Sequence, residues 1–138
     1  MAREPLVSRH QIMAKVRQKN SSPEISLRKE LHRRGLRYRL HVRGLPGSPD
    51  IVFPKHKVAV FVNGCFWHRH KGCARASFPK TNQHFWEEKF AANVARDERN
   101  YRDLRSMGWL PVVIWECQIL GSPADAATLV QKALSPHS

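Results

Sequence analysis

The chain lacks any long apolar segment. Its longest uninterrupted run of hydrophobic residues extends only from Val58 to Val62, whereas roughly 18 or more such residues are needed for a helix that crosses a bilayer. The N-terminus, MAREPLVSRH, also lacks the apolar middle of a secretory signal peptide. These absences exclude a transmembrane helix and predict an intracellular, cytoplasmic protein.

Cysteine is scarce as well. The chain has 3 cysteines, and an odd count argues against a closed disulfide framework. In the reducing compartment expected here, the thiols are either free or bound to a metal.

Acidic residues are too few to balance the basic ones. The chain has 24 Lys and Arg against 11 Asp and Glu, and its formal net charge is +13. That imbalance predicts a polyanionic partner, most simply nucleic acid, with an anionic membrane surface as the competing interpretation. A length of 138 residues with no internal repeat suits one domain covering 1–138.

Helix and strand signals alternate along the chain. A capping-box pattern at Ser8 predicts a short basic helix that runs to about Lys19, within a basic N-terminal arm at 1–19. Ser22, as a cap before Pro23, begins a second helix. The remaining patterns predict strands at 37–42, 51–53, 58–62 and 110–115, and helices at 83–107 and from 122 onward. This order predicts a mixed α/β domain with a small central sheet flanked by helices.

A cluster of metal-ligand residues follows the strand predicted at 58–62. Cys65, His70 and Cys73 have the spacing C-x4-H-x2-C, and Cys117 follows the end of another predicted strand. Three thiolates and one imidazole are ligands that Zn²⁺ prefers, and they close a tetrahedron, so we expect a structural zinc site. Free buried thiols are the alternative, and His68 could replace His70 as the ligand.

Acidic residues and a histidine are predicted near the same strand end. Asp50 begins the strand that pairs with 58–62, and His68 follows the latter strand. A carboxylate there could hold Mg²⁺ on a phosphate while the imidazole transfers a proton. Asp97 lies on the apolar face of the long helix and could orient His68 or pair with an arginine. Glu24 alone is most simply an N-terminal helix charge.

Aromatic residues gather around this loop. Phe66 and Trp67 stand among basic residues, and Trp86 opens the long helix. Each taken singly is more often a core residue than a contact. Together, on a basic protein, they could form a wedge between base pairs, which is easiest where a pair is already defective.

Three segments, GLPGSPDIVFPKHKVAVFVNGCFWHRHKGC, FWEEKFAANVARD and GWLPVVIWEC, together resemble the very-short-patch repair endonucleases over about residues 8–120. These bacterial enzymes nick DNA beside a T:G mismatch that arises when 5-methylcytosine is deaminated. The resemblance implies a restriction-endonuclease-like α/β core and a monomer that acts on double-stranded DNA. Mismatch-repair proteins are candidate partners.

The resemblance also implies roles for individual residues. Asp50, with the backbone carbonyl of Val62, would hold catalytic Mg²⁺, and His68 would be the catalytic histidine, with Glu24 and Asp97 beside it. The basic segment from Ser8 to Lys19 would contact DNA. The remaining roles are structural zinc binding by Cys65, His70, Cys73 and Cys117, and entry into the DNA by Phe66, Trp67 and Trp86.

One position departs from the family pattern. Asn63 stands where some members have a second active-site histidine, and an amide can hydrogen-bond a phosphate but cannot transfer a proton near neutral pH. Two other functions stay open from the residues alone. One is a zinc-stabilised, non-catalytic binder of distorted DNA, and the other is a nuclease that acts on intact recognition sites.

Overall fold

The computed structural model describes residues 21–135. The helix predicted from Ser8 to Lys19, and the basic arm at 1–19, lie outside the described residues. The described part alternates helices and strands: α2 (Ser22–Arg33), β1 (Arg39–Leu40), β2 (Ile51–Phe53), β3 (Val58–Asn63), a 3₁₀ turn η1 (Ala74–Ala76), α3 (Gln83–Ser106), β4 (Leu110–Trp115), α4 (Glu116–Gly121) and α5 (Pro123–Leu134).

The four strands form one small mixed sheet in the order β1-β2-β3-β4. β2 and β3 are the predicted antiparallel hairpin, with Ile51 opposite Val60, and β4 runs parallel to β3. Every residue of β3 is buried, because this strand has a neighbour on each side and helices over both faces. The predicted α/β class, with a small mixed sheet flanked by helices, is confirmed.

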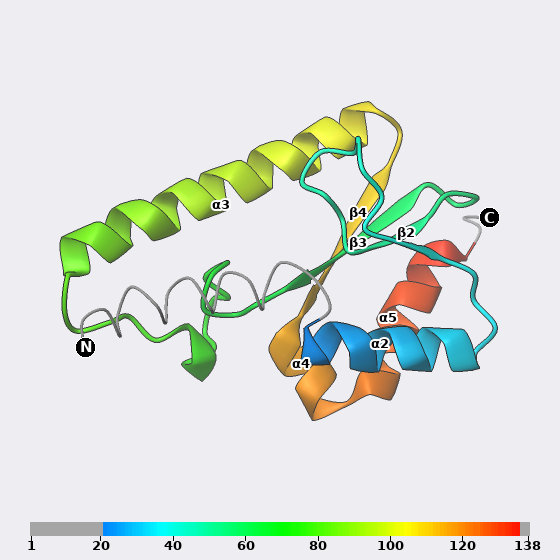
Figure 1. Ribbon diagram of the computed structural model, residues 1–138, viewed down its shortest axis with the longest axis horizontal. Coiled ribbons are helices and arrows are strands. Elements are labelled where there is room, and N and C mark those ends of the chain that lie inside the picture. Colours follow the sequence, from blue (N-terminus) through cyan, green and yellow to red (C-terminus); the bar gives the residue numbers. More distant parts are fainter. Residues whose placement is uncertain (1–20, 136–138) are drawn as a thin grey trace, which may run out of the picture.

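Alternation along β3 divides the core into two layers. Val58, Val60 and Val62 point toward α2, α4 and α5, which pack on one another beneath the sheet. Ala59 and Phe61 point the other way, toward α3. In Figure 1, α3 crosses above the sheet and continues well beyond it, toward the loop that follows β3. The side of the sheet that faces α3 is therefore where polar groups from the strands and the helix meet.

Local sequence explains most element boundaries and some differences from prediction. The cap of α2 is Ser21 rather than Ser22, since the Ser21 hydroxyl accepts the Glu24 N–H at 3.3 Å. The strand predicted at 37–42 shrinks to Arg39–Leu40, because His41 has a left-handed backbone with φ of 49°. The short helix α4 was not predicted.

Gly47 is required by both backbone and space. Its φ is +79°, and a Cβ there would lie 3.0 Å from Cε2 of Phe61 and 3.1 Å from Cβ of Asn100. We expect Gly47→Ala to lower the free energy of unfolding by about 3 kcal/mol, the sum of backbone strain and overpacking. Urea denaturation followed by circular dichroism would measure this change.

Gly44→Ala is the matched control for Gly47→Ala. Gly44 also has a positive φ, of +93°, but a Cβ at this position would meet nothing within 4 Å. The Gly44→Ala variant should therefore show the backbone strain alone, about 1 kcal/mol. Equal losses in the two variants would contradict the steric part of the argument.

Candidate active site

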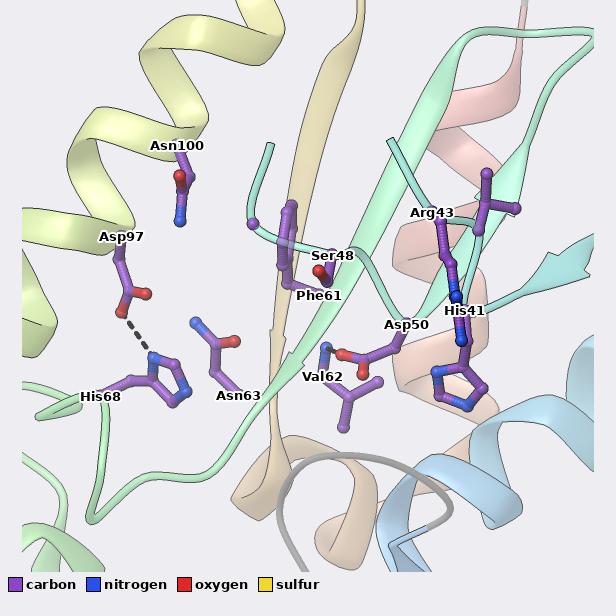
Figure 2. A pocket seen from close by; sticks show the side chains of 12 residues that line it. His41, Arg43, Ser48, Asp50, Phe61, Val62, Asn63, His68, Asp97 and Asn100 are labelled. Atoms are coloured by element: carbon purple, nitrogen blue, oxygen red, sulfur yellow. Dashed lines mark hydrogen bonds and ion pairs between the residues drawn. The ribbon is translucent and has the colours of Figure 1, made fainter. Parts of the chain in front are cut away.

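An open cleft of about 420 Å³ lies between α3 and the sheet. Figure 2 shows side chains from the loop before β2, from the end of β3, from the loop after it and from α3 converging on this space. The lining residues are His41, Val42, Arg43, Gly47, Ser48, Asp50, Phe61, Val62, Asn63, His68, Asp97 and Asn100. The cleft therefore brings together Asp50, His68 and Asp97, three residues singled out from the sequence.

Asp50 is fixed in place by the sheet. It directly precedes β2, its backbone N–H donates to the Val60 carbonyl at 3.0 Å, and the residue is only 8% exposed. Its Oδ2 accepts the backbone N–H of Val62 at 2.7 Å. The carboxylate thus lies directly beside Val62, whose carbonyl was predicted to share a metal with it.

His68 and Asp97 form a close pair across the cleft. Nδ1 of His68 lies 2.5 Å from Oδ2 of Asp97, and the two side chains are 13% and 17% exposed. The loop after β3 also fixes His68, because the backbone N–H of His68 donates to the Gly64 carbonyl. With Nδ1 held by a carboxylate, Nε2 is the ring nitrogen that would exchange a proton with a substrate. Among residues 21–135, Asp97 therefore pairs with His68 and not with an arginine, while the orienting role stays a prediction.

Glu24 lies at the same end of the sheet, in the first turn of α2, and its side chain contacts groups outside the helix terminus. Its side chain is 2% exposed, and its Oε2 is 3.1 Å from Nη1 of Arg28 and 3.2 Å from Nε2 of His41. Ligand atoms of Glu24, His41 and Asp50 all lie within 4.8 Å of one another. His41 was not singled out from the sequence. The sequence carried little indication of this position, because His41 is one of several alternating residues in the strand predicted at 37–42.

Asn63 faces the cleft from the end of β3 and is 4% exposed. Its side-chain amide donates to the Tyr101 hydroxyl at 2.9 Å. Burial, helped by the nearby carboxylates of Asp97 and Asp50, raises the pKa of Tyr101 to about 12. Tyr101 therefore stays a neutral phenol that fixes the Asn63 amide. The sequence did not predict this pairing, because the two residues are far apart along the chain.

The predicted Cys and His ligands do come together. Ligand atoms of Cys65, His70, Cys73 and Cys117 all lie within 4.8 Å of one another, and Sγ of Cys117 is 3.4 Å from Nδ1 of His70. A tetrahedral zinc site would place such atoms about 3.5–3.8 Å apart. The cluster could hold a metal, and its geometry favours His70 over His68 as the fourth ligand.

Surrounding groups hold this cluster together. The Cys65 N–H donates to Oε1 of Glu116 at 3.0 Å, which ties the loop to the start of α4. The His70 ring stacks on Trp115 with centroids 4.2 Å apart. Burial raises the pKa of Cys65 to about 12, whereas the Arg75 N–H lowers the pKa of Cys73. A buried thiol of this kind becomes a thiolate only beside a cation.

The aromatic residues form a cluster of their own. Phe66 contacts Trp67, Trp86 and Phe90 with centroid distances of 5.3, 5.7 and 5.2 Å. The guanidinium of Arg69 lies 4.0 Å from the centre of the Phe90 ring. Phe66 and Trp86 are partly exposed, but Trp67 is only 4% exposed. Trp67 is therefore a core residue in this conformation, and insertion into DNA would require it to move.

A buried aspartate before β2, a carboxylate-paired histidine and a strongly basic composition, together with the family match that follows, identify a DNA endonuclease of α/β fold. The model of the family "DNA mismatch endonuclease Vsr" matches residues 6–75. The chain belongs to this family, the very-short-patch repair endonucleases, as its motifs suggested.

Characterised relatives agree with this assignment. The chain is similar to the type II nicking enzyme V.XorIIP of Xanthomonas oryzae, with 46% identity over 80% of this chain and 81% of the relative. It is similar to V.NmeAIP of Neisseria meningitidis, with 41% identity over 78% and 76%. The DNA mismatch endonuclease Vsr of Escherichia coli is 35% identical over 83% and 72%. These matches favour an endonuclease over a non-catalytic binder of DNA.

Among the helices within 21–135, none combines the length and apolar character needed to cross a membrane. The partner indicated by family membership is DNA.

Proposed function

We propose that this protein nicks one strand of double-stranded DNA beside a T:G mismatch, by Mg²⁺-dependent hydrolysis of the phosphodiester bond. The observation that carries the proposal is the placement of Asp50 and the His68–Asp97 pair in one cleft. The relatives' names include both a mismatch endonuclease and several nicking enzymes, which supports a single-strand cut.

The residues of the cleft could supply the metal binding and the proton transfer that such a reaction needs. Asp50 and the Val62 carbonyl would hold Mg²⁺, which when bound neutralises charge on the scissile phosphate. The Asp50 carboxylate fits this role because it is buried and positioned by the Val62 N–H. His68 would take a proton from the attacking water or give one to the leaving oxygen, through Nε2. Asp97 would keep the ring in the required tautomer by accepting from Nδ1.

Other residues would bind and position the DNA. The Asn63 amide, held by Tyr101, has a second N–H that could donate to a phosphate oxygen. Phe66 and Trp86 are partly exposed and could wedge beside the mismatch, followed by Trp67 as the aromatic cluster opens. Glu24 lies beside Asp50 and would assist there. The proposed structural metal is Zn²⁺, held by Cys65, His70, Cys73 and Cys117.

The proposal extends to the cellular setting. We expect a monomer that acts on DNA in the bacterial cytoplasm, near the nucleoid, with mismatch-repair proteins as partners. Sedimentation of the protein with and without a T:G duplex would give its stoichiometry. A dimer on one mismatch would contradict the monomer.

A nicking assay tests the function directly. End-labelled duplexes that differ only in a T:G or a T:A pair are incubated with the protein, first without Mg²⁺ and then with Mg²⁺ restored. We expect a single-strand product from the T:G duplex only, and only with Mg²⁺. Equal cutting of the matched duplex would instead identify a nuclease that acts on intact recognition sites.

Asp97→Asn tests the orientation of His68. An amide at this position can still contact Nδ1, but it cannot stabilise a charged imidazole, so we expect the nicking rate to fall on the order of 10²-fold. DNA binding, measured by fluorescence anisotropy, should change little. The matched control is Glu98→Gln, because Glu98 is the exposed neighbour on α3. Equal effects in both variants would rule out a specific role for Asp97.

A further inference from the structure

Three potential ligands converge at the side of the cleft opposite the His68–Asp97 pair. Glu24 comes from the first turn of α2, His41 from the residue after β1, and Asp50 from the residue before β2. The His41 N–H donates to the Asp50 carbonyl at 3.1 Å, so the two residues are joined through the backbone. Figure 2 shows the His41 ring and the Asp50 carboxylate beside Val62.

One polar atom of this group is buried without a hydrogen-bond partner in the described part of the chain. Nε2 of His41 is fully buried, and it has no hydrogen-bond partner among residues 21–135. It lies 3.2 Å from Oε2 of Glu24, yet the two groups are not aligned as donor and acceptor. A buried polar atom left in this way calls for a bound group that is its partner.

The 3.2 Å distance between Nε2 of His41 and Oε2 of Glu24 fits two ligands of one shared cation. Two neighbouring ligands at about 2.1–2.2 Å in an octahedral shell lie about 3.0–3.1 Å apart. Ligands of a common ion point toward that ion rather than at each other, and this arrangement would explain the close approach of Nε2 and Oε2 without a hydrogen bond. Arg28 contacts the same Glu24 oxygen at 3.1 Å. A carboxylate has about four lone-pair positions, so it can accept a guanidinium and also bind a metal.

The donor set favours some metals over others. Carboxylates suit Mg²⁺ and Mn²⁺ alike, whereas imidazole nitrogen favours first-row transition metals. A site with two carboxylates and one imidazole should therefore bind Mn²⁺ or Co²⁺ more tightly than Mg²⁺. His41 follows the end of β1 and has a left-handed φ of 49°.

We propose that His41 is a direct ligand of the catalytic cation, together with Glu24 and Asp50, and that it makes this site prefer a transition-metal ion to Mg²⁺. The inference rests on the proposed function, because it concerns the cation site of the same cleft. It adds a ligand and a metal preference that the roles assigned to Asp50 and Val62 do not contain.

Metal binding without DNA tests this proposal. MnCl₂ is titrated into the zinc-loaded protein and free Mn²⁺ is followed by electron paramagnetic resonance, with MgCl₂ as competitor. Mn²⁺ is a suitable probe because it has little affinity for the thiolates of the Cys and His cluster. We expect Mn²⁺ to bind at least about tenfold more tightly than Mg²⁺. The His41→Gln substitution should lower the affinity for Mn²⁺ by about tenfold or more. Mg²⁺ affinity should change by less than about threefold, since the glutamine oxygen remains a hard ligand.

Two further measurements separate metal binding from folding. His56→Gln alters an exposed histidine in the turn between β2 and β3 and should leave both affinities unchanged. In the unsubstituted protein, bound Mn²⁺ should broaden the NMR signals of the His41 ring before those of His56. Equal Mn²⁺ affinity in His41→Gln, or unbroadened His41 signals at saturation, would overturn the role of His41 and leave the nicking assay unaffected. A protein that binds Mn²⁺ as described but cuts no T:G duplex would overturn the proposed function alone.

Discussion

Asp50→Asn is expected to lower the nicking rate by at least about 10³-fold while the protein stays folded. The asparagine oxygen can still accept the Val62 N–H, so the sheet edge should keep its geometry. The negative charge that holds the cation is lost, however, and a loss of about 4 kcal/mol in transition-state stabilisation corresponds to this rate change. Single-turnover nicking of a T:G duplex at saturating Mg²⁺ would measure the effect.

Asp103→Asn is the matched control for this experiment. Asp103 is an exposed residue of α3, and its replacement raises the net charge by the same amount. Both variants should therefore bind DNA slightly more tightly, with the same weakening by salt. Only Asp50→Asn should lose activity. A nicking rate within a few-fold of the unsubstituted protein would remove Asp50 from the proposed mechanism.

The sequence was most informative for features that depend on residues close together along the chain. The apolar run at Val58 to Val62 predicted a buried strand, and the spacing of Cys65, His70 and Cys73 placed three potential ligands on one short loop. Helix starts near Pro23 and Pro123 also depend on neighbouring residues alone, although the cap of α2 lies one residue before the predicted one. Such features need no knowledge of tertiary packing, and the structure agrees with them.

Features that depend on separated segments were harder to predict. The His68–Asp97 pair was foreseeable only as one of two options, since an apolar helical face does not reveal which group lies opposite it. The sequence did not indicate the position of His41, because no turn motif marks its left-handed backbone. The burial of Trp67 likewise depends on the surrounding aromatic cluster.

The end of β3 shows how one strand positions two sites. Alternation places Phe61 and Asn63 on the α3 side of the sheet, where Asn63 reaches Tyr101 and the cleft. Beyond Gly64, the chain turns and Cys65 is buried within the Cys and His cluster. His68 lies within the same loop, between Cys65 and His70, so its position depends on the loop as much as on Asp97. Disturbance of the Cys and His cluster should therefore affect catalysis as well as stability.

Cys117→Ser should produce the largest loss of stability. Cys117 is the one thiol of the cluster that comes from outside the loop, so it joins the loop to the end of β4. A structural zinc site contributes on the order of 10 kcal/mol to folding. Loss of one ligand should remove most of the metal and lower the melting temperature by roughly 10 °C or more. Elemental analysis and differential scanning calorimetry would measure zinc content and melting temperature.

His56→Gln is the control for zinc loss, since it removes a histidine that lies outside the cluster and should leave one zinc per chain. A strong chelator should reproduce the effect of Cys117→Ser in the unsubstituted protein, and added Zn²⁺ should reverse it. Nicking should fall in parallel, because the loop that carries the cluster also holds His68 against Asp97. Full activity in a zinc-free protein would show that the His68 position is set by the sheet and α3 alone.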